Sequence, residues 1–169
     1  MVQQMNDKIA FLNRYTLSSK NKVEFITDKS TIVNAPIPEY WKAAFLADTL
    51  EDRKSVVLGE WQKYLARELS NTILYLQTYL TDIELMRIGE EYSILYTVLS
   101  YKTKKLAFYE GKNPLSESNL GEKFDCPVEN IDKTIVDFYT KVHNGFYYYP
   151  SKTMGLDSTE NIDSMADFE

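Results

Sequence analysis

Cysteine and histidine are nearly absent from this chain, which has one Cys (Cys126) and one His (His143) among its 169 residues. A single cysteine excludes an internal disulfide and any thiolate metal cluster. A metal site built on His143 would need carboxylate partners, and none lies at a useful spacing. The N-terminal sequence lacks a secretory signal, so we expect a protein of a reducing compartment, the cytoplasm.

Long apolar runs and catalytic motifs are missing as well. No run approaches the roughly 18 apolar residues of a membrane-spanning helix. The glycine-rich phosphate loops, the GxSxG elbow, the HExxH motif and the EF-hand loop are all absent. We therefore expect no membrane span, no cofactor, no metal and no enzymatic activity.

Basic residues are outnumbered by acidic ones. The chain has 19 Lys and Arg against 25 Asp and Glu, a formal net charge of −6. A protein that binds nucleic acid needs a basic face to displace counterions, so direct nucleic-acid binding is not expected. Negative charge would favour encounter with a basic protein partner. The simpler interpretation is that the negative charge only keeps the protein soluble.

Aromatic residues are abundant by contrast, with 13 Tyr, 8 Phe and 2 Trp. A tyrosine has an apolar body and a polar tip, which suits both a half-buried sheet face and a protein interface. Tyrosine-rich strands are the simpler interpretation.

The first 50 residues predict two short helices and a hairpin. Apolar residues at helical spacing favour helices over 7–15 and 38–50. Between them, segments 23–26 and 31–33 are rich in β-branched and aromatic residues. They predict two strands that pair around a turn at 28–30.

The segment 51–87 predicts the main helical mass. Its apolar residues recur mostly at steps of three and four and define one buried face. Ser70, Asn71 and Thr72 offer a point at which this segment divides into two helices. The apolar positions are Trp61, Leu65, Leu69, Ile73, Leu76, Leu80 and Ile83.

A second hairpin is predicted by segments 92–101 and 106–109, which flank a lysine-rich turn. Both faces of the first strand are apolar, which is typical of a central strand buried on both sides. The following segment, 111–121, is rich in Gly, Pro, Asn and Ser and predicts a loop.

The segment 127–156, PVENIDKTIVDFYTKVHNGFYYYPSKTMGL, has the strongest pattern in the chain. A helix is predicted from near Pro127, with an apolar stripe at steps of three and four. Asn144 or Gly145 would supply the left-handed residue that ends it. Extended chain over 146–149 and a turn at 152–155 follow. The stripe comprises Val128, Ile131, Ile135, Phe138 and Val142.

Two side chains in this region have conventional catalytic potential. His143 is the one candidate for a base near neutral pH, although a cation-capable residue in a last helical turn also suits the helix dipole. Cys126 lies near a helix start, where a thiolate would be stabilised, although such a cysteine is more often a small buried hydrophobe. Structural roles are the simpler interpretation of both.

Candidate partner-binding residues lie in the aromatic run and the acidic end that follows it. We expect two of the four rings in 146–149 to be buried, which leaves others for an interface. The end from about residue 157 has acids and no base, and we expect it to be loosely ordered. The candidates are Tyr147, Tyr148, Tyr149, Asp157, Glu160 and Asp163.

The 30-residue segment resembles the signature of the SMI1/KNR4 (SUKH) superfamily. Members carry a helix with a proline and a Phe-Tyr pair, then an Asn-Gly turn, an aromatic strand and a Gly-Leu pair. The matching residues here are Pro127, Phe138, Tyr139, Asn144, Gly145, Phe146, Gly155 and Leu156. The resemblance implies a single α+β domain over residues 1–169, with an antiparallel sheet packed against several helices.

The resemblance also implies a function. Bacterial members are similar to immunity proteins, which bind and neutralise a cognate polymorphic toxin, often a nuclease, in the cytoplasm. A non-enzymatic inhibitor of a basic toxin domain is therefore expected. Two alternatives stay open: a regulatory or adaptor protein of the same family, and a small hydrolase that uses His143, Cys126 or a carboxylate pair. The sequence does not specify an oligomeric state.

Overall fold

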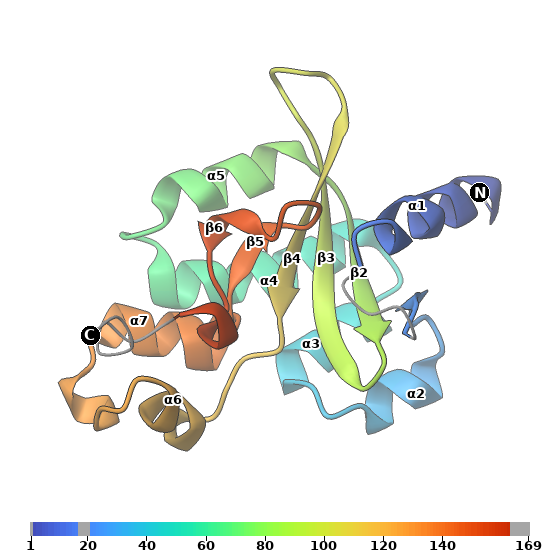
Figure 1. The fold of residues 1–169 in the computed structure, drawn as a ribbon. Helices are drawn as coiled ribbons and strands as arrows, with labels where there is room; N and C mark the ends of the chain where they lie inside the picture. The colour runs from blue at the N-terminus through green and yellow to red at the C-terminus, as the bar shows by residue number, and fades with distance from the viewer. Residues whose placement is uncertain (1, 17–20, 163–169) are drawn as a thin grey trace.

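The computed structural model describes residues 2–16 and 21–162, and it has the α+β architecture expected from the sequence (Figure 1). Within these residues, six strands form one open sheet in the order β1-β2-β3-β4-β5-β6, and every neighbouring pair is antiparallel. The strands are β1 (Val23–Phe25), β2 (Leu80–Ile88), β3 (Glu91–Leu99), β4 (Leu106–Lys112), β5 (Phe146–Tyr148) and β6 (Thr153–Leu156).

Seven α-helices accompany the sheet in the part of the chain that the structure describes. They are α1 (Val2–Asn13), α2 (Lys29–Asn34), α3 (Glu39–Leu46), α4 (Leu50–Leu65), α5 (Ser70–Tyr79), α6 (Glu117–Lys123) and α7 (Lys133–Asp137). A π-helical turn, η2 (Phe138–Val142), extends α7, and the short 3₁₀ turns η1 (Val128–Asn130) and η3 (Thr159–Asn161) lie on either side.

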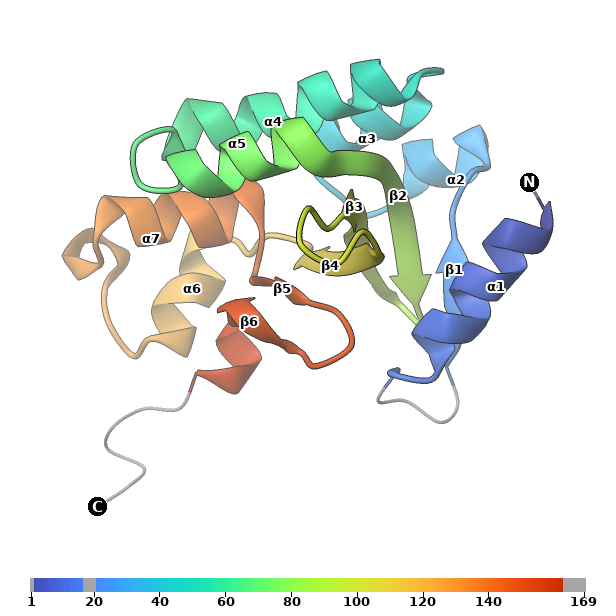
Figure 2. The same ribbon diagram turned by 90° about the horizontal axis from the view of Figure 1, so that it is seen from above.

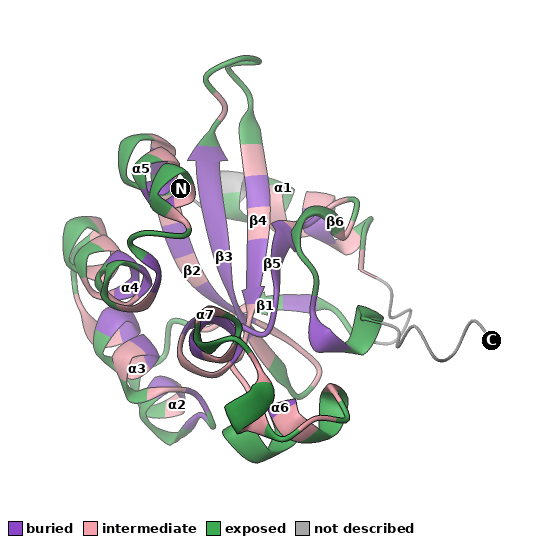
Figure 3. Ribbon diagram, turned by 90° about the vertical axis from the view of Figure 1, so that its left-hand side faces the viewer, coloured by how far each residue is buried: buried purple, intermediate pink, exposed green. Residues whose placement is uncertain are grey.

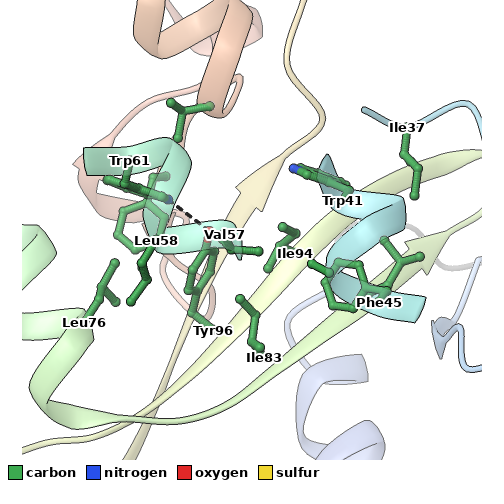
Figure 4. Packing of buried hydrophobic residues seen from close by; sticks show 14 of the residues in the cluster. Ile37, Trp41, Phe45, Val57, Leu58, Trp61, Leu76, Ile83, Ile94 and Tyr96 are labelled. Atoms are coloured by element: carbon green, nitrogen blue, oxygen red, sulfur yellow. Dashed lines mark hydrogen bonds between the residues drawn. The ribbon is translucent and has the colours of Figure 1, made fainter. Parts of the chain in front are cut away.

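The sheet is covered unequally on its two faces. Figure 2 shows α3, α4 and α5 side by side along one face, with α1 beside β1 at the far end. Under these helices lies the main core, in which Trp41, Trp61 and Tyr96 are fully buried (Figure 4). On the second face, Leu12 of α1 packs with residues that include Phe108.

The second hairpin is confirmed as β3 and β4, which pair from Ser93 with Lys112 to Leu99 with Leu106. β3 is buried on both faces, as its two apolar sides predicted. Tyr96 faces the main core, and Leu95 faces the smaller apolar cluster on the second face, to which Leu12 and Phe108 also belong. Figure 3 shows buried residues along β3 and exposed residues at the tip of the hairpin.

The first predicted hairpin is wrong. β1 pairs with β2 instead of with residues 31–33, and those residues lie in α2. The side chain of Asp28 accepts a hydrogen bond from the backbone N–H of Thr31 at 2.7 Å, so it caps a helix. Aspartate serves turns and helix caps by the same bond, which is why the turn interpretation failed.

The predicted helical segment 51–87 is correct only as far as Tyr79. α4 ends at Leu65 and α5 begins at Ser70, close to the expected division. From Leu80 onward the chain is β2. Leu80 and Ile83 fit a helical step of three, but both reach the same core from a strand, with a register irregularity between Leu80 and Asp82.

The continuous helix predicted from near Pro127 to Val142 is also wrong, since it is divided into η1, α7 and η2. Asp132 caps α7 by accepting from the N–H of Thr134, so the helix begins later than Pro127. Ile135, assigned to the buried stripe, is 40% exposed. The predicted loop at 111–121 contains the start of α6, capped by Ser116.

Candidate functional site

A hollow of about 850 Å³ opens on the second face of the sheet and is lined by residues of β3, β4, β5 and the segment around η3. We call it the polar groove. Its charged lining residues are Glu90, Glu91, Glu110, Lys112, Lys152 and Glu160. Four carboxylates against two ammonium groups leave the groove with a net negative charge.

Lys112 lies at the centre of one ion-pair group in the groove. Its Nζ lies 2.8 Å from Oε2 of Glu160 and 3.9 Å from Oε2 of Glu91. Burial lowers the pKa of Lys112, but the bond and charge of Glu160, with help from Glu91, outweigh burial and raise it overall. Burial likewise opposes ionisation of Glu160, yet the bond from Lys112 brings its pKa below the usual value. Both groups are therefore charged at neutral pH.

Glu110 forms the second polar group and is 5% exposed. It accepts hydrogen bonds from the hydroxyl of Tyr147 at 3.0 Å and from Nζ of Lys152 at 3.1 Å. Lys152 also lies over the ring of Tyr149, 3.3 Å from its centroid. Burial lowers the pKa of Lys152, although the Glu110 carboxylate opposes that shift. A buried carboxylate with two donors is well satisfied, so this group stabilises the groove wall.

Ser93 lines the same groove from β3 and is only 3% exposed. It occupies the side of β3 opposite Ile94, which faces the helices. Its hydroxyl is not among the fully buried polar atoms that lack a hydrogen-bond partner in the described ranges, which belong to Trp41, Arg53, Thr97 and Thr159.

His143 lies on the other side of the sheet, sealed in the main core. Its Nδ1 donates to the carbonyl of Lys112 at 3.1 Å, so Nε2 is the acceptor for the Tyr96 hydroxyl at 2.7 Å. Tyr96 in turn accepts from the indole N–H of Trp61 at 3.1 Å, the bond drawn in Figure 4. Burial lowers the pKa of His143 to about 3.

The expected role of His143 as a cationic helix-end residue is therefore wrong. The ring is fully buried and neutral, and both of its nitrogens are occupied by the chain itself. A general base must reach a substrate proton, directly or through one water. His143 makes a structural connection between β3, β4 and the end of η2.

The Asn-Gly pair holds the segment around η3 against the sheet. Asn144 accepts from the N–H of Thr159 at 3.0 Å and donates to Oε1 of Glu160 at 3.3 Å. Gly145 has a φ of +94°, and a Cβ there would lie 2.6 Å from the N of Ser158. Asn144 thus positions Glu160 in the groove wall. Gly145 has a positive φ as expected, but it does not end the helix, because η2 ends at Val142 and the capping residue His143 is extended.

The other signature residues are also structural in their contacts. Phe138 and Tyr139 are buried, and the Tyr139 hydroxyl donates to the carbonyl of Asp157 at 2.8 Å. A Cβ on Gly155 would lie 2.0 Å from the carbonyl oxygen of Phe146, so β6 approaches β5 too closely for a side chain. Pro127 precedes η1 and Leu156 ends β6 at the surface.

The aromatic run is more buried than expected. Phe146, Tyr147 and Tyr149 are all buried, and Tyr148 is half-buried, where two of the four were expected in the core. Tyr147 nevertheless lines the polar groove, whereas Tyr148 and Tyr149 do not.

The three acidic candidate residues also differ in their position relative to the polar groove. Glu160 lines the groove and Asp157 is exposed outside it, while Asp163 lies outside the described residues. Ser158 and Thr159 are buried, so the expectation of a loose end from residue 157 does not hold for the part that is described.

Other reactive or metal-binding arrangements are sparse. Cys126 is half-buried and its Sγ lies 3.5 Å from the carbonyl of Pro127. Within the described ranges, no three His, Cys, Asp or Glu side chains gather closely enough to hold a metal ion. Among those residues, too, no helix has the length and apolar character needed to cross a membrane.

Sequence reasoning missed Ser93, Glu110, Lys112 and Lys152. The signal available for two of them was alternation in β4, where Phe108, Glu110 and Lys112 share one face of a strand. Comparison with known proteins adds nothing to these observations, since no family model, curated protein or solved structure matches the chain.

Proposed function

We propose that this protein is a non-enzymatic immunity protein, which binds and neutralises a basic toxin domain in the cytoplasm of the cell that makes it. The proposal begins from the resemblance of residues 127–156 to the SUKH signature. A toxin that acts on nucleic acid carries a basic surface, and an acidic protein of complementary shape can occupy that surface.

The observation that carries the proposal is the charge of the polar groove. Its two lysines are already paired with Glu110 and Glu160 inside the groove. Glu91 has only a 3.9 Å approach to Lys112, and its side chain is 79% exposed. Glu90 is exposed and has no ion pair among the described residues. The groove therefore presents unneutralised carboxylates to a cationic partner.

The surroundings of His143 favour binding over the hydrolase alternative. A hydrolase needs a general base or a nucleophile that can reach its substrate. His143 is sealed in the core, and a pKa of about 3 leaves it neutral and a weak base. Cys126 lies outside the polar groove.

Co-expression tests the proposal. The probe is the C-terminal domain of a secreted protein encoded beside the gene for this chain, produced in a bacterial host from an inducible promoter. We expect the domain to arrest growth alone, and the full chain to restore growth and co-purify with the domain. Arrest without rescue, together with no co-purification, would overturn the proposal. Recovery of several unrelated partners instead would favour the adaptor alternative.

A further inference from the structure

We propose that the tip of the β3–β4 hairpin is a docking site for an anionic lipid surface. The hairpin tip comprises residues 99–106, LSYKTKKL, where β3 ends and β4 begins. None of these residues lines the polar groove, so this surface is separate from the one that the proposed function uses. The tip would act by binding alone, and no chemical step is involved.

The hairpin tip is the basic end of an acidic protein. Lys102, Lys104 and Lys105 lie in it, and none of the three forms an ion pair with any residue that the structure describes. Residues 92–109, which contain the tip, and residues 69–81, which contain α5, include no aspartate or glutamate. All 25 acidic residues lie elsewhere in the chain, so the tip presents positive charge to an anionic surface.

Three large apolar side chains are exposed on the same tip. Leu99 is 41%, Leu106 is 54% and Tyr101 is 66% exposed. Leu99 and Leu106 are direct partners in the β3–β4 register, so their side chains are cross-strand neighbours. Single exposed apolar residues are ordinary, but a group of them beside unpaired lysines is typical of a surface that enters the lipid headgroup region.

The tip is held in one conformation by its own contacts. The N–H of Ser100 donates to the carbonyl of Lys105 at 2.9 Å, and the N–H of Lys104 donates to the carbonyl of Ser100 at 2.9 Å. The ring of Tyr101 lies between Tyr79 of α5, 6.0 Å away between centroids, and Nζ of Lys104, 4.2 Å from its centroid. A preformed tip loses little conformational freedom when it binds.

The position of the tip suits a broad, flat partner. Figure 1 shows it standing out beyond the helices at the top of the view, and Figure 3 shows its residues exposed. A tip that projects in this way can reach a flat surface before the acidic parts of the protein do. A bilayer is such a surface, and the cytoplasmic leaflet of a cell membrane is negatively charged.

A lipid surface uses both kinds of side chain on the tip, whereas a nucleic acid uses only one. Nucleic acid binds lysines through its phosphates and aromatic rings through its bases, but it gives little to the leucine pair. In a bilayer, lysine stems and leucines lie against acyl chains, tyrosine suits the interface, and the ammonium groups attract anionic headgroups. We expect weak, reversible binding, because each lysine near an anionic surface contributes about fivefold in affinity.

Vesicle sedimentation tests the docking site with a defined probe. The full chain is mixed with large vesicles of phosphatidylcholine, either alone or with about one third phosphatidylserine. The affinity should be about tenfold or more higher for the vesicles that contain phosphatidylserine, and it should fall as sodium chloride rises. Equal binding to both kinds of vesicle, or binding to neither, would overturn the proposal.

A fluorescent label shows whether the tip is the part that meets the vesicle. Thr103→Cys in a Cys126→Ser chain places one nitrobenzoxadiazole label at an exposed position of the tip, and Glu68→Cys in the same chain places one between α4 and α5. Anionic vesicles should make the Thr103 label brighter and shift its emission to shorter wavelength, because the dye leaves water. The Glu68 label should not change. An equal change of both labels, or none at Thr103, would contradict docking by the tip.

Charge reversal with a matched control examines the lysines. Lys102→Glu/Lys105→Glu changes two exposed residues of the tip, while Lys29→Glu/Lys63→Glu makes the same charge change at exposed residues outside it. The tip variant should bind the anionic vesicles about twentyfold or more weakly, since each lysine contributes about fivefold. The control should change the affinity by less than about threefold. Equal losses for the two variants would show that net charge, and not the tip, determines binding.

The leucine pair separates a lipid surface from a nucleic acid. Leu99→Ser/Leu106→Ser should weaken binding to the anionic vesicles about tenfold, because apolar area no longer leaves water. Both side chains are exposed, so the core is unchanged, and circular dichroism with thermal unfolding confirms that each variant folds. If the leucine variant binds vesicles as the wild type does, while oligouridylate binds more tightly than vesicles and needs the same lysines, the occupant is a nucleic acid and the lipid assignment is wrong.

The proposed function is tested apart from this surface. The Lys102→Glu/Lys105→Glu variant should still rescue growth in the co-expression experiment, because the polar groove is unchanged. Loss of rescue by this variant would place the tip in the toxin interface and overturn its assignment to lipid. If the wild type fails to rescue growth but binds anionic vesicles through the tip, the immunity function fails and the lipid assignment stands.

Discussion

Gly111 lies directly beneath His143, so that a Cβ added to Gly111 would come within 2.5 Å of the imidazole Nε2. Because Gly111 has no side chain, the ring of His143 can lie between the Tyr96 hydroxyl and the carbonyl of Lys112, and it is hydrogen-bonded to both. Lys112 belongs to β4 and its side chain lies in the polar groove. The buried histidine on one face of the sheet therefore fixes the backbone of a groove residue on the other face.

Gly111→Ala should destabilise the fold by about 1–3 kcal/mol, since overpacking a filled core displaces its neighbours. Chemical denaturation monitored by circular dichroism measures this free energy of unfolding. Gly59→Ala is the matched control, because nothing lies within 4 Å of its added Cβ in α4. Alanine at this helical position should stabilise the protein by roughly 0.5–1 kcal/mol. Equal effects at both glycines would contradict the role of His143.

The free energy of unfolding should fall as the pH drops below about 6.5. Burial lowers the pKa of His143 from its ordinary value of 6.5 to about 3 in the folded protein, so between these values the unfolded chain binds a proton that the folded chain does not. Stability is then lost with falling pH at up to about 1.4 kcal/mol per unit.

The His143→Gln variant isolates this contribution from those of the carboxylates. Its stability between pH 6 and 4 should decline less steeply than that of the wild type, by roughly 1 kcal/mol per pH unit. Parallel curves for the two proteins would show that the buried ring does not stay neutral in the native state.

Asn144→Ala should release the segment around η3 from the sheet. The substitution removes the acceptor for the Thr159 N–H and the donor to Glu160, at a cost of about 1–3 kcal/mol for a buried unsatisfied group. Hydrogen exchange should show faster exchange of the Thr159 amide. Asn34→Ala removes one exposed bond to the carbonyl of Ser30 and should change stability by less than about 0.5 kcal/mol.

The complex with the toxin domain should weaken as salt rises, because the contacts expected at the groove rim are exposed to solvent. Isothermal titration calorimetry at low and at high sodium chloride concentration measures this dependence. The variant Glu90→Lys/Glu91→Lys should show a shallower dependence than the wild type. A wild-type affinity that does not respond to salt would indicate an apolar interface instead.

The sequence predicted local elements where side-chain pattern and backbone preference agree. The hairpin of β3 and β4 is an example, since the first strand has β-branched and aromatic residues on both of its faces, which is typical of a strand buried on both sides. β2 was missed because Leu80 and Ile83 suit either a helix or a strand, and pairing with β1 and β3 decides between them. Tertiary contacts overrode the local pattern there.

The candidate site was largely beyond sequence reasoning for a related reason. Its lining joins Glu91, Lys112, Tyr147 and Glu160, which come from distant parts of the chain and meet only when the strands are ordered. Tyr147 and Glu160 were among the expected binding residues, but as part of an aromatic run and an acidic tail. The burial of His143 could not be read from its place at the end of a helix, because the π-helical turn of η2 directs it inward.

Charge exchange across the interface shows most directly whether the carboxylates of the polar groove bind a basic toxin domain. The dissociation constant is measured for Glu91→Arg with the wild-type toxin domain, and again with a toxin domain in which one surface arginine is replaced by glutamate. We predict that Glu91→Arg weakens binding about tenfold or more, and that one arginine-to-glutamate substitution in the partner restores most of the loss. A Glu91→Arg protein that binds as tightly as the wild type would show that the groove carboxylates do not bind the toxin domain.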